Sequence, residues 1–170
     1  HFANISDVST LIETKEISPV ELTEHLLNRI ESIDRKLKSY VTIFADRAID
    51  RAKQAEKEIL VGDYRGKLHG IPLSVKDLCY TKGIRTMGGL KVRKDFIPSF
   101  DATVIKRLSL AGAILLGKNA LTEGALSGYN PEFEIPINPW GHKLWAGVSS
   151  SGSGVAVAAG LCFGSLGTDT

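Results

Sequence analysis

The stretch Gly147-Val-Ser-Ser-Ser-Gly-Ser-Gly154 runs directly into Val155-Ala-Val-Ala-Ala159, and this junction decides how the second half of the chain folds. It places four serines and three glycines in eight residues, ahead of an apolar segment with a helical pattern. A flexible Gly/Ser spacer would not lead straight into a segment that must be buried to be stable. We therefore interpret the serine run as a loop at a helix start, where unpaired backbone N–H groups can hold an anion or an oxyanion.

Two common motifs of serine and glycine do not match this run. A phosphate-binding P-loop needs Gly-x-x-x-x-Gly-Lys-Ser/Thr, and no lysine follows Lys143. The nucleophile elbow needs Gly-x-Ser-x-Gly, whereas Gly147-Val-Ser-Ser-Ser151 ends in serine. What remains is a loop of hydroxyls that needs a proton acceptor from elsewhere in the chain.

Lys76 is the candidate for that acceptor. It ends the apolar run Ile71–Val75 in Gly70-Ile-Pro-Leu-Ser-Val-Lys-Asp77, which has the pattern of a buried strand. Taken alone, the segment favours a surface lysine paired with the adjacent Asp77. A lysine inside a protein is rare unless it is paired or functional, and burial lowers its pKa from ~10.4. A lysine that is to act as a base near neutral pH needs its pKa lowered by about three units.

Five motifs follow one another along the chain: Gly-Ile-Pro-Leu-Ser-Val-Lys-Asp, Gly117-Lys-Asn119, Asn138-Pro-Trp140, the serine run, and Gly167-Thr-Asp-Thr170. In these motifs and their order, the chain from about Ile17 onward resembles the amidase signature family. Five ordered motifs make a chance match improbable. The resemblance implies the N-terminal part of a serine amidohydrolase.

The resemblance also implies a Ser–Ser–Lys triad. Lys76 takes the place of the catalytic lysine, and Ser149 takes the place of the bridging serine, which in the family follows a cis peptide bond, here Val148–Ser149. In the family, the Gly-Thr-Asp-Thr string continues with Gly-Gly-Ser, whose serine is the nucleophile, three residues beyond Thr170. The family often has glycine where this chain has Val148 and Ser151. These departures weaken assignment to a subgroup, such as the glutamine-hydrolysing subunit of the tRNA amidotransferases.

The glycines divide the chain into two parts. Only two of the seventeen glycines precede residue 70, and residues 1–69 have helical patterns: a Ser18-Pro-Val-Glu21 capping box, followed by an apolar face, and a second helix over 45–60. From residue 70 onward, strands at 71–75, 114–116 and 162–166 alternate with helices at 102–111 and 153–161. The sequence predicts an α/β fold: an N-terminal helical segment, 1–69, and the first part of an open mixed sheet covered by helices, 70–170.

Composition narrows the function further. A net charge of +2 with interspersed signs argues against direct nucleic-acid binding, and no apolar run approaches a membrane span. Cys79, Cys162 and the four histidines lack the spacing of a metal site, so we expect no metal or other cofactor and a reduced, cytoplasmic protein. Three aromatic residues could line a pocket near the serine run, although core packing is the more frequent role of such residues: Tyr129, Trp140 and Trp145.

We therefore expect an amidase that cleaves a carboxamide C–N bond in a small molecule through a seryl acyl-enzyme, with Lys76 and Ser149 relaying the proton. A homodimer is compatible with this interpretation. The alternative is a non-catalytic piece that serves as an assembly or binding module.

The first prediction concerns residues 1–170 expressed alone. We expect no amide hydrolysis and poor folding, because the nucleophile and the loop after Thr170 that should supply oxyanion N–H groups are missing, and because the strands lose neighbours. Thermal unfolding and an amidase assay on the purified segment test both halves. A cooperative transition would contradict the folding half, and turnover would contradict the catalytic half.

Overall fold

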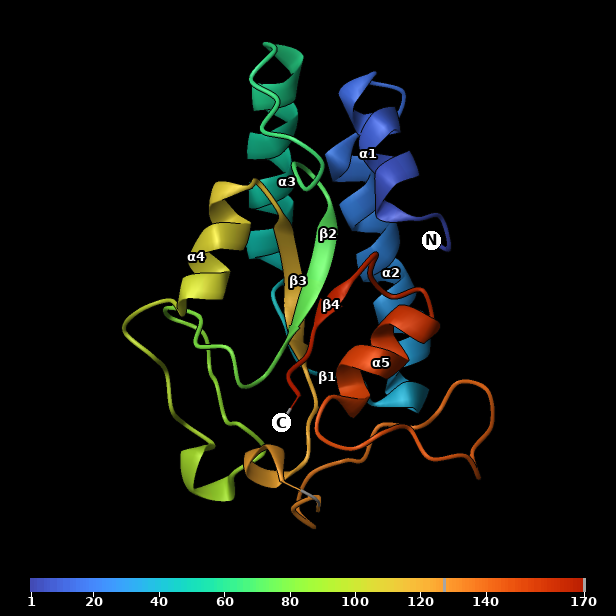
Figure 1. Cartoon of the computed structure of the whole chain (residues 1–170), viewed down its shortest axis with the longest axis vertical. Helices are drawn as coiled ribbons and strands as arrows, with labels where there is room; N and C mark the ends of the chain where they lie inside the picture. Colours follow the sequence, from blue (N-terminus) through green and yellow to red (C-terminus); the bar gives the residue numbers. More distant parts are fainter. Residues whose placement is uncertain (127, 170) are drawn as a thin grey trace.

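A computed structural model describes residues 1–126 and 128–169 of the chain (Figure 1). The helices and strands, in chain order, are α1 (Ile5–Glu13), α2 (Pro19–Leu37), β1 (Tyr40–Ile43), α3 (Ala45–Leu60), β2 (Pro72–Lys76), α4 (Thr103–Leu110), β3 (Ile114–Asn119), α5 (Ser151–Ala158) and β4 (Ser165–Leu166). Short 3-10 turns lie at Lys91–Arg93 and Glu123–Ala125. In the described residues, no helix is both long and apolar enough to cross a bilayer.

The four strands form one mixed sheet in the order β1-β3-β2-β4. β2 pairs parallel with both β3 and β4, and β1 pairs antiparallel with β3. Because β2 and β3 are parallel neighbours, their carboxyl ends meet at one edge of the sheet, with Lys76 opposite Asn119. The predicted α/β class and open mixed sheet are confirmed.

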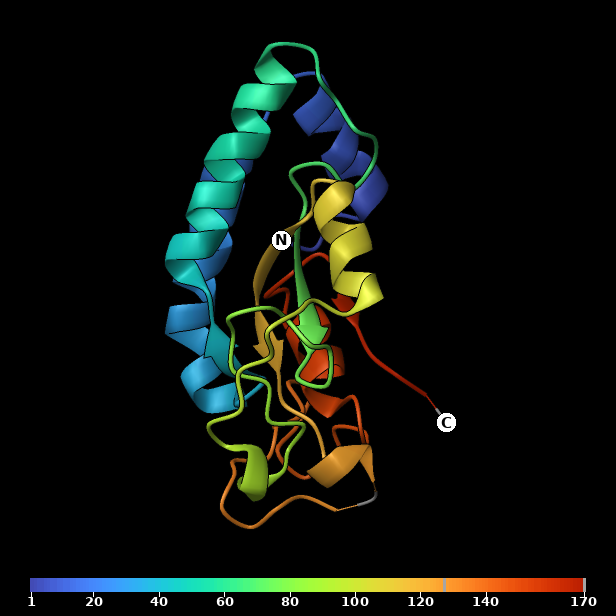
Figure 2. The ribbon, with the colours of Figure 1, turned by 90° about the vertical axis from the view of Figure 1, so that its left-hand side faces the viewer.

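Helices cover both faces of this sheet (Figure 2). Side chains of α2, α3 and α5 pack with Ile114 and Leu116 of β3 in one core cluster. On the other face, side chains of α1 join Ile71 and Leu73, with Leu108 of α4 packed against them. The strand pair β2–β3 is therefore buried between layers, which is why its sequence consists of short apolar runs.

The helix signals in the sequence match the structure closely. The Ser18 hydroxyl accepts hydrogen bonds from the backbone N–H groups of Val20 (3.0 Å) and Glu21 (3.3 Å), so Ser18 caps α2 as expected. α3 occupies residues 45–60, the predicted range. α5 begins at Ser151, two residues earlier than expected, so part of the serine run is itself helical.

Two elements, α1 and β1, have no counterpart among the sequence-based expectations. β1 adds an edge strand to a segment, residues 1–69, expected to be purely helical. It is four residues long and begins two residues after Lys38, which adopts a left-handed backbone conformation that ends α2. Its strand state depends on pairing with β3, a partner more than seventy positions away, rather than on a local pattern. The predicted domain boundary at 69/70 stays a prediction.

Small residues let α5 approach the sheet. The Gly152 N–H donates to the Ala120 carbonyl oxygen at 3.1 Å. A Cβ atom on Gly152 would lie 2.5 Å from both the N and O atoms of Ala120 and 2.6 Å from the Ser39 carbonyl oxygen. The start of α5 is thus pressed against the chain that leaves β3, and only glycine fits there.

The second prediction follows from this contact. Gly152→Ala should destabilise the complete protein by about 3 kcal/mol, because the new methyl group meets rigid backbone atoms. Gly154→Ala on the same helix is the matched control, since nothing lies within 4 Å of the position that its methyl group would take; it should be neutral or stabilising by up to about 1 kcal/mol. Denaturant unfolding measures both, and equal effects of the two changes would refute the close approach.

Candidate active site

Lys76 lies at the carboxyl end of β2 and is fully buried, with 0% of its surface exposed. It does not pair with Asp77 as a surface lysine would. Alternation along the strand sends the Asp77 side chain to the opposite face of the sheet, where it pairs with Lys118. The expectation of a buried lysine at the strand end is therefore confirmed.

The Lys76 amine donates hydrogen bonds to two hydroxyl groups. Its Nζ atom donates to Thr168 Oγ1 at 2.6 Å and to Ser150 Oγ at 3.2 Å. Ser150 Oγ in turn donates to the Thr168 carbonyl oxygen (3.0 Å) and accepts from the Thr168 N–H (3.1 Å). The lysine, the serine run and the Gly167-Thr-Asp-Thr string, which lie far apart in the sequence, meet at one point.

Glycine at position 167 makes this meeting possible. A Cβ atom there would lie 2.8 Å from Ser150 Oγ and 3.0 Å from Ser150 Cβ. Any larger residue would push Ser150 away from the backbone of Thr168. The glycine of this string therefore has a steric role next to the hydroxyl that contacts Lys76.

Ser149, the serine that the resemblance places in the bridging role, is half-buried beside this cluster. Among the described residues, no hydrogen bond joins it to Lys76; Ser150 makes that contact instead. No cis peptide bond occurs in the described residues, so the bond between Val148 and Ser149 is trans here. In the sequence, Ser150 stands out only as a neighbour of Ser149, and no local pattern identifies Thr168 as a partner of the lysine.

Burial lowers the pKa of the Lys76 amine, because the charged form loses its water. The Asp169 carboxylate, and Cys79 when it is a thiolate, act in the opposite direction, since a negative charge favours the ammonium form. The net direction is downward, which raises the fraction of neutral amine near neutral pH. A neutral amine surrounded by hydroxyls can accept a proton from one of them.

Further hydrogen bonds fix the elements around the site. Ser153 Oγ on α5 donates to the Leu166 carbonyl oxygen (3.1 Å), and Ser165 Oγ donates to Asn119 Oδ1 (2.8 Å). These contacts tie α5 to β4 and β4 to the end of β3. The serine run and the following string are thereby held at the same sheet edge as Lys76.

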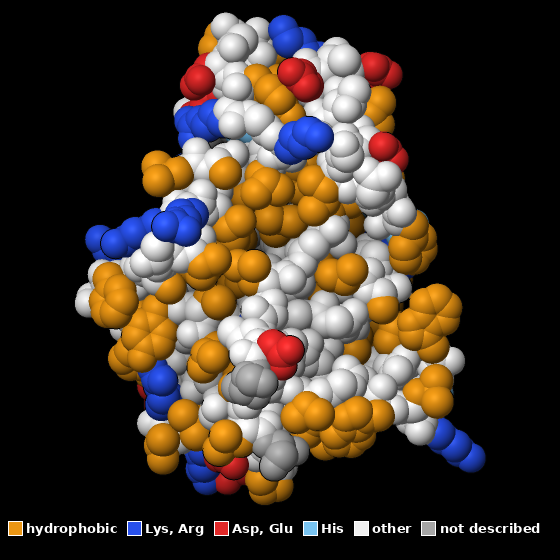
Figure 3. Space-filling view, in the orientation of Figure 1, with side chains coloured by type: hydrophobic (Ala, Val, Ile, Leu, Met, Phe, Trp, Pro, Cys, Tyr) orange, Lys and Arg blue, Asp and Glu red, His pale blue; other side chains and the backbone are white. Residues whose placement is uncertain are grey.

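The aromatic residues near the serine run do not form a core. Trp140 and Trp145 are 79% and 66% exposed, so core packing was the wrong expectation for both. Trp145 and Tyr129 line a cavity of about 470 Å³ that reaches Gly147, and the Tyr129 hydroxyl donates to Ser151 Oγ at 2.5 Å. In Figure 3, hydrophobic side chains gather on the lower part of the molecule, where Figure 1 places this segment.

The remaining polar candidates take other roles. His69 is fully buried, where its Nε2 atom lies 3.0 Å from Glu58 Oε2 and its Nδ1 atom accepts from the Arg65 N–H. Cys79 and Cys162 are both free thiols. Within residues 1–126 and 128–169, no group of three or more potential metal-binding side chains comes together. Thr170, the last residue of the motif, lies outside the described residues.

The chain is similar to known proteins over nearly its whole length. Residues 21–170 match the family described as Amidase. The chain is 51% identical over 166 residues to putative amidase AmiD of Mycobacterium tuberculosis (strain ATCC 25618 / H37Rv), covering 98% of this chain and 35% of that protein. It is 41% identical over 170 residues to a glutamyl-tRNA(Gln) amidotransferase subunit of Acaryochloris marina, covering 99% of this chain and 35% of that protein.

A solved structure shares the fold as well. Native peptide amidase from Stenotrophomonas maltophilia superposes with a TM-score of 0.87 at 34% identity, covering 94% of this chain and 34% of that one. The chain therefore spans about a third of the length of the proteins that it matches.

Proposed function

Since the chain belongs to the amidase family, we propose that the complete protein hydrolyses the C–N bond of a carboxamide through a seryl acyl-enzyme. The observation that carries the proposal is the buried Lys76 amine, which lies 2.6 Å and 3.2 Å from two hydroxyls at a shared sheet edge. A serine needs a neutral base to become a useful nucleophile, and burial of Lys76 favours the neutral amine.

The reaction has two halves. A serine hydroxyl attacks the amide carbonyl carbon, and its proton passes through a relay serine to the Lys76 amine. The tetrahedral intermediate then collapses: the C–N bond breaks, and the Lys76 ammonium returns the proton to the leaving nitrogen. Water attacks the acyl-enzyme by the same relay and releases the carboxylic acid. We infer, from the family's Gly-Gly-Ser continuation, that the nucleophile follows residue 170 in sequence.

We propose Ser149 as the relay serine and Ser150 as an anchor. The Ser150 hydroxyl already donates its one proton to the Thr168 carbonyl oxygen while it accepts from Lys76 and from the Thr168 N–H. A hydroxyl bound in this way fixes the lysine but has no proton to offer a second partner. Ser149 lies next to Ser150 and is half-buried, and its hydroxyl forms no such hydrogen bonds with the described residues.

We propose a small carboxamide as substrate and the cytoplasm as compartment, with no metal or other cofactor and no direct contact with nucleic acid. The two free thiols support a reducing compartment, and the small net charge of +2 supports the absence of a nucleic-acid surface. The relay needs only hydroxyl and amine groups.

The identity to an amidotransferase subunit supports a second candidate, glutamine hydrolysis within an assembly. It is the weaker candidate, because identity to the putative amidase AmiD is higher, 51% against 41%. Turnover of simple aryl and aliphatic carboxamides by the isolated protein favours the first candidate. Turnover restricted to glutamine favours the second.

The third prediction tests the base. Lys76→Ala in the complete protein should lower kcat by about three orders of magnitude or more, because the nucleophile loses its proton acceptor. Lys106→Ala, which removes an exposed lysine from α4, is the control and should turn over as the wild type does. Initial rates on carboxamides, with thermal unfolding as a check of folding, measure the effect. A folded Lys76→Ala protein with wild-type activity would reject the assignment, and loss of wild-type activity on chelation would point to a metal.

The fourth prediction compares the three consecutive serines. Ser149→Ala should lower kcat by at least a hundredfold, because the relay loses its hydroxyl. Ser151→Ala should stay within about tenfold, since that hydroxyl serves as an acceptor for Tyr129. Ser150→Ala should fall between them, because Lys76 loses one of two acceptors. Comparable losses at all three positions would mean that the serines shape the backbone, and a larger loss at Ser150 than at Ser149 would move the relay to Ser150.

A further inference from the structure

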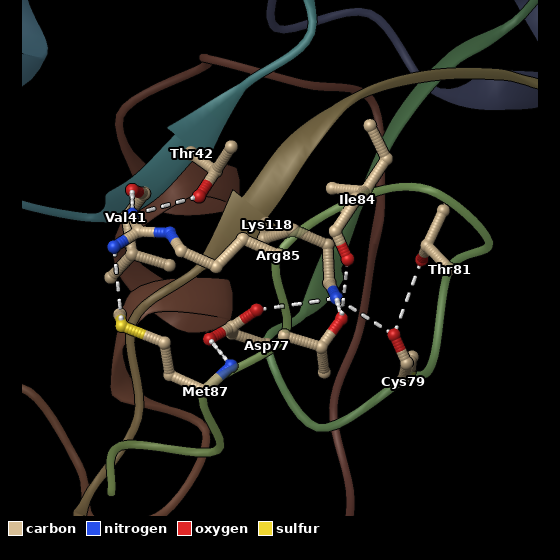
Figure 4. Close-up of polar contacts among 10 residues, drawn as sticks. Val41, Thr42, Asp77, Cys79, Thr81, Ile84, Arg85, Met87 and Lys118 are labelled. Atoms are coloured by element: carbon tan, nitrogen blue, oxygen red, sulfur yellow. Dashed lines mark hydrogen bonds and ion pairs between the residues drawn. The ribbon is translucent and has the colours of Figure 1, made fainter. Parts of the chain in front are cut away.

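A second buried lysine lies beside Lys76 on the neighbouring strand. Lys118 of β3 stands opposite Val75 in the parallel register, and its side chain is fully buried on the face of the sheet opposite to Lys76. Its Nζ atom forms an ion pair with Asp77 Oδ1 at 3.2 Å (Figure 4). Asp77 is the residue directly after Lys76, so the pair is attached to the proposed base through one peptide bond.

Lys118 and Asp77 together hold the turn that follows β2. Lys118 Nζ donates to the Cys79 carbonyl oxygen (2.7 Å) and to Thr86 Oγ1 (2.8 Å). The second carboxylate oxygen of Asp77 accepts from the Met87 N–H at 2.9 Å. Figure 4 shows these contacts converging from the 77–87 loop on one amine and one carboxylate.

The backbone on either side of Lys76 is fixed by the same cluster. The Cys79 N–H donates to the Lys76 carbonyl oxygen (3.0 Å), and the Asp77 N–H donates to the Asn119 carbonyl oxygen (2.9 Å). The Gly88 N–H donates to the Asp77 carbonyl oxygen at 3.0 Å. Release of the Lys118 amine would leave Asp77 Oδ1 and the Cys79 carbonyl oxygen without this partner.

We propose that Lys118 is a positioning residue for the amidase reaction: through Asp77, Cys79 and Thr86 it fixes the turn that aims Lys76, and it cancels the charge of Asp77 beside that base. This inference rests on the proposed function, in which Lys76 accepts the proton. A purely stabilising role is a poor explanation of the pair, because replacement of a buried ion pair by apolar residues is often neutral or stabilising.

The charge balance around Lys76 gives the proposal a measurable sign. The charged or titratable groups that act on Lys76 are the Cys79 thiol on the following turn and Asp169 after β4, while the charges of Asp77 and Lys118 are paired with each other on the opposite face of the sheet. Arg85 of the same loop is directed to β1, where it donates to the Val41 carbonyl oxygen at 2.9 Å. Burial raises the pKa of Asp77 and lowers that of Lys118, and each partner's charge opposes the shift of the other.

Removal of either partner should shift the Lys76 pKa in opposite directions. In Lys118→Met the Asp77 carboxylate keeps the Met87 N–H as a hydrogen-bond donor and, once unpaired, favours the Lys76 ammonium, so the acid limb of kcat/KM should move to higher pH. In Asp77→Asn the Lys118 ammonium keeps the Cys79 carbonyl and the Thr86 hydroxyl as acceptors and disfavours the Lys76 ammonium, so the acid limb should move to lower pH. The expected size is roughly one pH unit, at the low end of the shifts that a nearby unpaired charge produces.

The experiment measures pH profiles of kcat/KM for the complete protein and four variants: Lys118→Met, Asp77→Asn, the double variant, and the exposed-lysine control Lys106→Met. The double variant should restore the wild-type acid limb, because no charge remains unpaired, while its kcat stays at least tenfold low, because the turn has lost its clamp. Lys106→Met should match the wild type. If Lys118→Met and Asp77→Asn have the same acid limb of kcat/KM, the proposal is overturned.

Two further measurements keep the outcome decisive. NMR titration of ¹³C-labelled lysine, assigned with Lys76→Ala, reports the Lys76 pKa without turnover. If the Lys76 pKa shifts in opposite directions in the two single variants, the charge effect is supported. This holds even if Lys76→Ala proves active and so contradicts the proposed function. If the single variants do not fold, the double variant decides: a kcat within twofold of the wild type overturns the positioning role, and a loss of tenfold or more at wild-type KM and thermal stability supports it.

Discussion

Burial of the Lys76 amine is the constraint around which the rest of the site is arranged. An ammonium group in a protein interior is costly, and the protein meets that cost with hydroxyl acceptors from Ser150 and Thr168 at hydrogen-bond distance. Hydroxyls can accept from an ammonium and donate to a neutral amine, so they tolerate either protonation state. This freedom separates Lys76 from a lysine locked in an ion pair.

The contrast with Lys118 is built into the strand geometry. Parallel pairing of β2 and β3 brings both lysines to one edge of the sheet, and the pleat sends them to opposite faces. On one face the amine is paired with the carboxylate of Asp77; on the other it is held by hydroxyls. The two lysines therefore differ in their surroundings: Lys118 is held in an ion pair, and Lys76 is bound by hydroxyl groups.

Close packing of small residues completes the site. Gly152 lets α5 touch the backbone at Ala120 and Ser39, and Gly167 lets Ser150 reach the backbone of Thr168. Larger side chains at either position would separate the serine run from the strand that carries Lys76. The high content of glycine and serine in this region therefore reflects distances between backbones rather than flexibility.

The sequence by itself determined the family, the α/β class, the extent of α3 and the cap of α2, because ordered motifs, helical periodicity and capping are local patterns. It also pointed to Lys76, since a lysine at the end of an apolar strand is unusual in any fold. Only the tertiary structure decided that β1 joins the sheet, that the tryptophans are exposed, and that Ser150 and Thr168 receive the lysine amine. The strand pairing and the hydroxyl contacts depend on segments tens of residues apart in the sequence that meet in the fold, and a local pattern carries no information about the distance between such segments.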